Sequence, residues 1–212
     1  MSHPLKPLLR AALLAACAAS LSGCISLLPK TKPAQLYRFE GARGAAAAAP
    51  ADARPPFGVL KLRADFDRAA SGDRILTVSD NRVAYIAEAR WVSPAIVLFD
   101  EALSRAFDDN AGPARLVSRG EAGRAAYILR LDVRDFEAVY ESGPEAAPTI
   151  VVGVRASLTR SSDRVLVGEQ LLESRVKASD NRVSAITAGF GQAVSEVLAK
   201  LVDWTNQAGA SA

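Results

Sequence analysis

The stretch YILRLDVRDF, residues 127–136, decides the fold class of this chain. Apolar side chains stand at every second position from Tyr127 to Val133, and they alternate with Arg130, Asp132 and Arg134. A period of two is typical of a β-strand that has one face in the core and the other in water. The stretch therefore predicts a strand in a sheet whose apolar face needs a cover.

Two further strand candidates follow, at residues 149–158 and 165–177. Turn-forming sequences separate the three candidates: SGP at residues 142–144 and SSD at residues 161–163. Short turns between consecutive strands predict an antiparallel meander.

Residues upstream of the meander predict a first helix. Ser93 supplies a capping hydroxyl before Pro94 at the first helical position, which explains this serine without a role as a nucleophile. The sequence NAGP at residues 110–113 ends the helix. One face is apolar at helical spacing, with Ile96, Phe99, Leu103 and Phe107.

A longer amphipathic helix is expected after the meander, with Ser179 or Asp180 as its cap. Gly189 and Gly191 weaken it by about 1 kcal/mol each relative to alanine, so they either allow close packing on the sheet or bend the helix. Its apolar positions fall at spacings of three and four: Val183, Ile186, Phe190, Val194, Val197, Leu201 and Trp204.

The region before the first helix predicts short strands at residues 35–40, 58–63, 75–78 and 83–87, with a polar loop at 65–73. Residues 41–56 are rich in alanine and proline and predict a long surface loop. Strands, helix, strands and helix in this order predict one α/β domain over residues 35–207, with a mixed sheet and packed helices. Residues 208–212 are expected to form a disordered tail.

A short repeat occurs in the chain. The sequence SDNRV stands at residues 79–83 and again at residues 179–183. Its surroundings do not match, and the first copy precedes a predicted strand while the second precedes a predicted helix. We interpret the copies as two independent turn or cap signals.

The N-terminal residues 1–23 have the layout of a secretory signal, with Lys6 and Arg10 before an apolar run at 11–21. The run is shorter than the roughly 20 apolar residues of a transmembrane helix. The sequence LSGC that ends at Cys24 resembles the lipobox of bacterial lipoproteins. We therefore expect cleavage between Gly23 and Cys24, a diacylglycerol and an N-acyl chain on that cysteine, and a tether at residues 24–34.

Two alternatives to this anchor exist. Cys17 ends a looser lipobox, but it would leave only six residues after Arg10 for the apolar run, fewer than the roughly 7–15 that are usual. The segment also fits an ordinary signal peptide or a short anchor. The residue after Cys24 is Ile25 rather than the aspartate of inner-membrane lipoproteins, which favours the periplasmic face of the outer membrane.

Composition excludes several kinds of chemistry for the cleaved chain. His3 is the only histidine, and Cys17 and Cys24 are the only cysteines. Residues 25–212 thus lack a Ser-His-Asp triad, a cysteine nucleophile, a disulfide framework and a normal zinc site. Loss of Lys6 and Arg10 leaves 24 of the 26 Lys and Arg against 23 Asp and Glu, so the charge gives no support for nucleic-acid binding. We expect no catalytic residue, no metal and no cofactor besides the lipid.

Arg90 and Trp91 are candidates for partner binding, because arginine and tryptophan are enriched at binding hot spots. The competing interpretation is that Trp91 anchors the helix start to the core and Arg90 pairs with a carboxylate.

The acidic residues Asp132, Asp135 and Glu137 alternate with Arg130 and Arg134 on one strand. Such a pattern is typical of a solvated face rather than of a metal or acid–base site.

Several of these segments together resemble the ABC-type transport auxiliary lipoprotein family, the PqiC/YmbA-like group. They are the lipobox, LYR at 36–38, VAYI at 83–86, RWVSP at 90–94, LSRAF at 103–107 and LDVRDFE at 131–137. The most distinctive is Tyr-x4-Arg-Trp-x2-Pro, which begins at Tyr85, before an amphipathic helix. The Ala/Pro insertion at residues 41–56 departs from the pattern and indicates a longer loop.

The resemblance implies a fold akin to the TolB N-terminal domain and a non-enzymatic docking role. Family members are implied to act at the outer membrane, beside an ABC ATPase, a permease and an MCE-domain protein that spans the periplasm and carries phospholipid or other hydrophobic molecules. A ring-shaped partner would favour a homo-oligomer. The docking surface would be a loop and helix region around Tyr85 and Trp91, or the face with Arg130 and Arg134. The alternatives are a structural or assembly lipoprotein of the outer membrane and, less favoured, a periplasmic enzyme.

Overall fold

The computed structural model describes residues 33–39 and 55–211. Residues Ala34–Ala212 form one compact unit, which contains a nine-stranded mixed sheet with two packed α-helices in its described part. The predicted α/β class is confirmed. The predicted signal at residues 1–23, residues 24–32 of the predicted tether at 24–34, and most of the Ala/Pro segment at 41–56 lie outside the described residues.

The predicted meander is confirmed. Strand β7 (Ala125–Val139) pairs antiparallel with β8 (Thr149–Arg160), which pairs antiparallel with β9 (Leu166–Lys177). Leu129, Leu131 and Val133 of β7 are buried, as the alternation predicts.

The other edge of β7 pairs in parallel with three short strands in succession. These are β2 (Phe57–Lys61), β3 (Asp65–Phe66) and β4 (Arg74–Ser79). Further out, β5 (Arg82–Trp91) is antiparallel to β4, β1 (Gln35–Tyr37) is parallel to β5, and β6 (Ala114–Leu116) is parallel to β2. The long strand β7 therefore holds both halves of the sheet together.

A β-bulge interrupts the alternation of β7. Val133 pairs with Val154 and Asp135 pairs with Gly153, so Arg134 is an extra residue on β7. A bulge moves the following side chains to the opposite faces. Accordingly, Phe136 and Ala138 are buried, although the period that begins at Tyr127 would place them outside.

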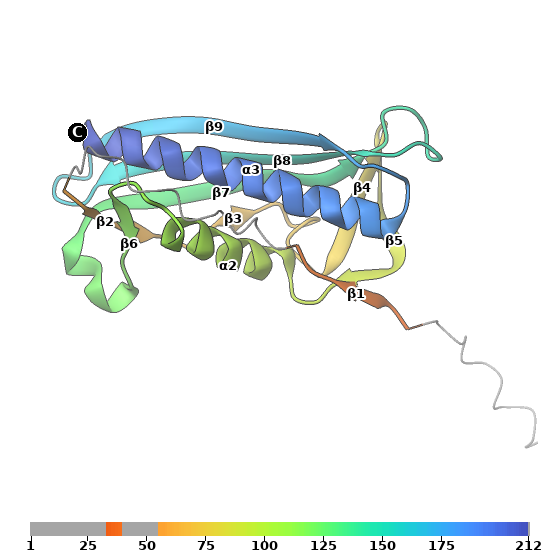
Figure 1. The fold of residues 1–212 in the computed structure, drawn as a ribbon, viewed down its shortest axis with the longest axis horizontal. Coiled ribbons are helices and arrows are strands. Elements are labelled where there is room, and N and C mark those ends of the chain that lie inside the picture. The colour runs from red at the N-terminus through yellow and green to blue at the C-terminus, as the bar shows by residue number, and fades with distance from the viewer. Residues whose placement is uncertain (1–32, 40–54, 212) are drawn as a thin grey trace, which may run out of the picture. The chain divides into compact units, whose positions relative to one another are not determined.

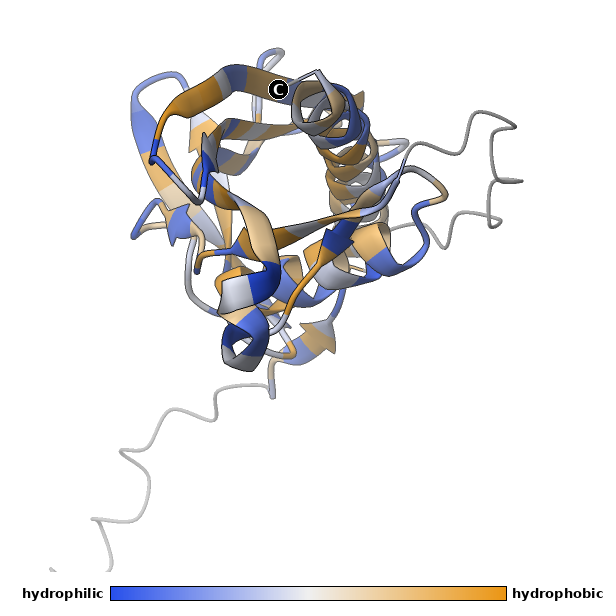
Figure 2. Cartoon of the chain, turned by 90° about the vertical axis from the view of Figure 1, so that its left-hand side faces the viewer, coloured by the Kyte–Doolittle hydropathy of each residue, from blue (hydrophilic) through white to orange (hydrophobic). Residues whose placement is uncertain are grey.

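The helices α2 (Ala95–Asp108) and α3 (Val183–Ala210) pack on the apolar face of the sheet (Figure 1). The end-on view shows the sheet curving around the interior, with α3 along its open side (Figure 2). The predicted apolar helix positions that are fully buried are Phe99, Leu103, Phe107, Ile186, Phe190, Val194, Val197 and Leu201.

Both predicted helix caps are wrong. Pro94 is the N-cap of α2 and no side chain caps it. Instead, the amide of Ala95 donates to the carbonyl of Gly72 at 2.8 Å, so a distant loop supplies the acceptor. Arg182 is the N-cap of α3, again without a side-chain bond.

The carboxylate of Asp180, one of the two residues expected to cap α3, serves its own loop. It accepts the amide of Asn181 and pairs with Arg182, each at 2.6 Å.

The C-terminal boundary also differs from the prediction. Helix α3 continues to Ala210, so residues 208–210 are helical rather than a disordered tail. The hydroxyl of Tyr127 donates to the carbonyl of Gly209 at 2.8 Å, and Gly209 is buried. Tertiary packing against β7 thus extends the helix past the last large apolar residue, Trp204.

The two SDNRV copies lie in unrelated structures, as predicted. The first forms the turn between β4 and β5, where Asp80 has a φ of 52°. The second precedes α3.

Three short elements carry no sequence period and were not predicted: β3, β6 and the 3₁₀ helix η2 (Arg119–Arg124). Among the described residues, no helix is long and apolar enough to cross a membrane.

Candidate functional site

The structure places Trp91 in the core rather than on the surface. Its side chain is 2% exposed, and its ring lies edge-on to Phe39 at 5.1 Å and to Phe190 at 5.2 Å between centroids. Trp91 therefore anchors the segment before α2, as the second interpretation holds. Its ring has no exposed surface to offer a partner.

Arg90 and Tyr85, the neighbouring candidates on β5, have partners within the chain. The Arg90 guanidinium donates to both carboxylate oxygens of Asp73, at 3.1 and 2.9 Å. The Tyr85 hydroxyl donates to the carbonyl of Ala69 at 3.1 Å, and the Arg74 guanidinium lies 3.8 Å from the centre of its ring. The region from Tyr85 to Trp91 is a strand, so the expectation of a loop and helix surface there is wrong.

The outer face of β7, β8 and β9 is a solvated, ion-paired surface, as the charge alternation predicts. Arg134 pairs with Asp132 at 2.9 Å, and Arg155 pairs with Glu169 at 2.5 Å. Arg130 is exposed and lines a hollow of about 360 Å³ beside these pairs. Its role in partner binding stays a prediction.

Asp135 and Glu137 lie close together on this face. Burial raises the pKa of Asp135, and the nearby Glu173 raises it further. Burial also raises the pKa of Glu137, to which Asp135 and then Asp67 contribute. A methyl group at Gly153 would collide with the Asp135 carboxylate, so this glycine makes room for the half-buried acid.

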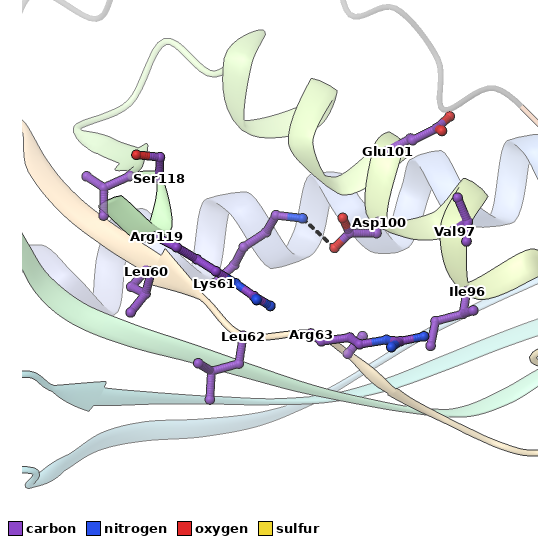
Figure 3. Close-up of a pocket in the computed structure, with 12 residues that line it drawn as sticks. Leu60, Lys61, Leu62, Arg63, Ile96, Val97, Asp100, Glu101, Ser118 and Arg119 are labelled. Atoms are coloured by element: carbon purple, nitrogen blue, oxygen red, sulfur yellow. Dashed lines mark hydrogen bonds and ion pairs between the residues drawn. The ribbon is translucent and has the colours of Figure 1, made fainter. Parts of the chain in front are cut away.

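A pocket that sequence reasoning missed lies between the β2–β3 segment and α2 (Figure 3). Its volume is about 540 Å³. An ion pair between Lys61 and Asp100 connects the strand to the helix across it. The pocket is lined by residues 60–64 of the strand segment, by Ile96, Val97, Asp100 and Glu101 of α2, and by Val117, Ser118 and Arg119.

These residues come from three segments that the fold alone brings together. The only signal in the sequence was the alternation of GVLKLR at residues 58–63, which predicts a strand but not an open edge.

The fold places the described residues in the class of mixed α/β domains. The described residues form a mixed α/β domain that has ion-paired side chains on its surface and a cluster of aromatic side chains within its largely aliphatic core. They include no group of three or more His, Cys, Asp or Glu that could hold a metal ion.

The sequence comparison identifies the family within this class. The model of the family described as ABC-type transport auxiliary lipoprotein component matches residues 37–202, and the chain belongs to this family. The resemblance drawn from the sequence motifs is thereby confirmed. No curated protein matches the sequence.

Two solved structures have a similar fold. The crystal structure of protein XCC0632 from Xanthomonas campestris, of the DUF330 family model, has a TM-score of 0.70 and 26% identity, over 84% of this chain and 98% of that chain. The hypothetical protein CT253 from Chlamydia trachomatis has a TM-score of 0.52 and 10% identity, over 74% of this chain and 99% of that chain. At this lower identity the likeness concerns the fold alone.

Proposed function

We propose that this chain is an outer-membrane lipoprotein that docks an MCE-type transport protein at the periplasmic face of that membrane. The observation that carries the proposal is the family match over residues 37–202, whose description names a lipoprotein component of ABC-type transport. In this proposal Cys24 carries the diacylglycerol and N-acyl chains, and the partner system includes an ABC permease and an ATPase.

The position of β1 supports a membrane-near placement of one end of the domain. Residues 25–34 would span about 17–31 Å between the coil and extended limits. They lead directly into β1, which lies toward the same end of the compact unit as the N-terminal end of α3 (Figure 1). Leu36 and Val92 are exposed there, at 63% and 46%. We infer that this end faces the bilayer.

The opposite end and the flanks of the domain remain for the partner. Strand β6 and the C-terminal end of α3 lie toward that opposite end (Figure 1). In the proposal a ring-shaped partner is matched by a homo-oligomer of this chain. The contact is then repeated once for each copy.

Docking is proposed over turnover because of the residue content of the cleaved chain. Residues 25–212 contain no histidine and no cysteine. On the outer face, the half-exposed carboxylates of Asp132 and Glu169 pair with arginines rather than with a nucleophile. These observations favour a binding role.

Affinity purification of the lipidated protein from gently solubilised envelopes tests the proposal. We expect recovery of an MCE-domain protein together with its permease and ATPase. The Cys24→Ala variant is the matched control and should lose this recovery, because it lacks the lipid that holds the chain at the outer membrane in this proposal. Consistent absence of an MCE protein, with the chain lipidated and folded, would leave a structural or assembly lipoprotein instead.

A further inference from the structure

The outer edge of the β2–β3 segment is open where β6 leaves it. Strand β6 pairs with β2 only from Phe57 to Val59. The last bond along this edge is from the amide of Val117 to the carbonyl of Val59, at 3.0 Å, and the chain then turns into η2.

The inner edge of the same segment stays attached to β7. The amide of Leu62 donates to the carbonyl of Leu129 at 2.9 Å. Alternate residues of a strand direct their backbone groups to opposite edges, so those of Lys61 and Arg63 face outward. No strand in the described part of the chain pairs with them there.

The pocket of about 540 Å³ lies against this open edge. Five consecutive residues, 60–64, line one side of it, and the first turns of α2 line the other. At about 3.3 Å per residue, five residues extend over about 17 Å, the length of an average strand. The pocket is therefore a slot along the unpaired outer edge of the end of β2 and of the segment that links β2 to β3.

The slot is lined by apolar side chains and by charged ones, and two of the charged side chains are arginines without a partner in the part of the chain that the structure describes. Asp100 is neutralised by Lys61, and Glu101 faces Arg105 at 3.8 Å. The side chains of Arg63 and Arg119 make no ion pair or hydrogen bond with another described residue. Figure 3 shows Arg119 extending toward Lys61 and Arg63 extending toward Ile96. The apolar lining is supplied by Leu60, Leu62, Ile96, Val117 and Val97, which is 42% exposed.

We propose that this slot binds an extended peptide segment of a partner protein by strand addition to the outer edge of β2, in line with β6. Main-chain hydrogen bonds to Lys61 and Arg63 hold the peptide, as in other cases of β-augmentation. Carboxylates of the peptide pair with the guanidinium groups of Arg63 and Arg119, whose planar fork matches a carboxylate. Alternate side chains of a strand share a face, so acidic residues at every second position suit both arginines.

An anionic amphiphile is the competing occupant, since it too would satisfy apolar side chains and guanidinium groups. The open backbone edge favours the peptide, because a peptide supplies the missing donors and acceptors and an alkyl chain supplies none. The inference concerns a site on the domain surface and stands independently of the transport role proposed above.

Binding to the full chain in an uncharged detergent tests the proposal. The probe is a fluorescein-labelled octapeptide of alternating valine and glutamate, measured by fluorescence anisotropy. We expect saturable binding, which the Arg63→Gln/Arg119→Gln variant weakens by about tenfold or more. Arg82→Gln is the matched control, because Arg82 is an exposed arginine at the β4–β5 turn, away from the slot. Its affinity should equal that of the unaltered chain.

Hydrogen–deuterium exchange separates strand addition from other modes of binding. The peptide should slow exchange of the amides of Lys61 and Arg63, and a version N-methylated at alternate residues should neither bind nor protect them. Binding without this protection, or no saturable binding of the octapeptide, would overturn the proposal. Calorimetric binding of octanoate that requires both arginines, without binding of the peptide, would assign the slot to an amphiphile instead.

Discussion

The indole ring of Trp91 meets the ring of Phe190 edge to face, with 5.2 Å between centroids and an interplanar angle of 83°. This contact joins the end of β5 to the first half of α3, across about a hundred residues of sequence. Phe39 and Phe136 complete the cluster around the indole. The cluster thus connects the residues that follow β1 and the end of β5 with β7 and α3.

Trp91→Ala should therefore destabilise the fold by about 3–5 kcal/mol, the usual loss for a large aromatic side chain in a core. Urea denaturation followed by circular dichroism measures the change. Arg90→Ala is the neighbouring control and should lower the free energy of unfolding by no more than about 1 kcal/mol, because its pair with Asp73 is half-exposed. A Trp91 variant with unchanged stability would contradict the assignment of this side chain to the core.

Gly189 allows α3 to pack closely on β8. A methyl group at this position would lie 2.8 Å from Cγ1 of Ile150, which is closer than such contacts permit. Overpacking typically costs about 1–3 kcal/mol, while alanine favours the helix by about 1 kcal/mol. Gly189→Ala should thus lower the free energy of unfolding, or at best leave it unchanged.

A double-mutant cycle with Ile150→Ala isolates this contact. The single Ile150→Ala change should destabilise by about 2–5 kcal/mol. In that background Gly189→Ala should become stabilising, because the space is free and only the helix preference remains. If Gly189→Ala had the same effect on stability in both backgrounds, contact with Ile150 would not be the reason that glycine is needed at this position.

The pKa values of Asp135 and Glu137 are raised from their ordinary 3.8 and 4.5, mainly by burial. As pH rises through this window, the unfolded chain loses these protons first, so the folded state holds more protons and its stability falls. Asp135→Asn and Glu137→Gln should therefore increase the free energy of unfolding at neutral pH. Urea denaturation between about pH 4 and pH 8 should also show that the free energy of unfolding decreases less with rising pH in these variants than in the unaltered chain.

Asp163 provides a control of opposite sign. The pKa of its carboxyl is lowered, first by the backbone amide of Val165 and then by the bond to Arg160. Its contribution to stability is present above its ordinary pKa and is lost as pH falls. Asp163→Asn should thus lower the free energy of unfolding at neutral pH, and a gain there would contradict the account.

The meander and both helices could be predicted because each has a period that burial on one face imposes. The alternation from Tyr127 to Val133 predicts β7 up to the bulge at Arg134. The bulge itself could not be predicted, because it depends on Asp135 lying over Gly153 of another strand. The cap of α2 was predicted wrongly for the same reason, because a residue distant in the sequence decides the local structure. The carbonyl of Gly72 replaces a local side chain as the hydrogen-bond acceptor at the start of this helix.

The sequence predicted the candidate surfaces unevenly. Charge alternation predicted the ion-paired face with Arg134, since that pattern is local to one strand. The slot was missed because Lys61 and Asp100 are distant in sequence and only the packing of α2 on the sheet makes them a pair. Enrichment of tryptophan at interfaces pointed to Trp91 as a surface residue, yet the same large apolar ring also favours burial.

Cys24 should be the residue that holds the protein on the membrane. Each buried methylene contributes about 0.8 kcal/mol, so one acyl chain binds marginally, whereas several chains bind firmly. Cys24→Ala should accordingly release the domain into the soluble periplasmic fraction or leave an uncleaved precursor, while Cys17→Ala should behave as the unaltered protein. Mass spectrometry of the mature N-terminus gives the direct readout, with a diacylglyceryl and an N-acyl group expected on Cys24. Acylation at Cys17, or an unmodified N-terminus on a membrane-bound chain, would contradict the assignment. Fractionation of the two variants, with the folded state of each checked by circular dichroism, separates loss of the anchor from loss of the fold.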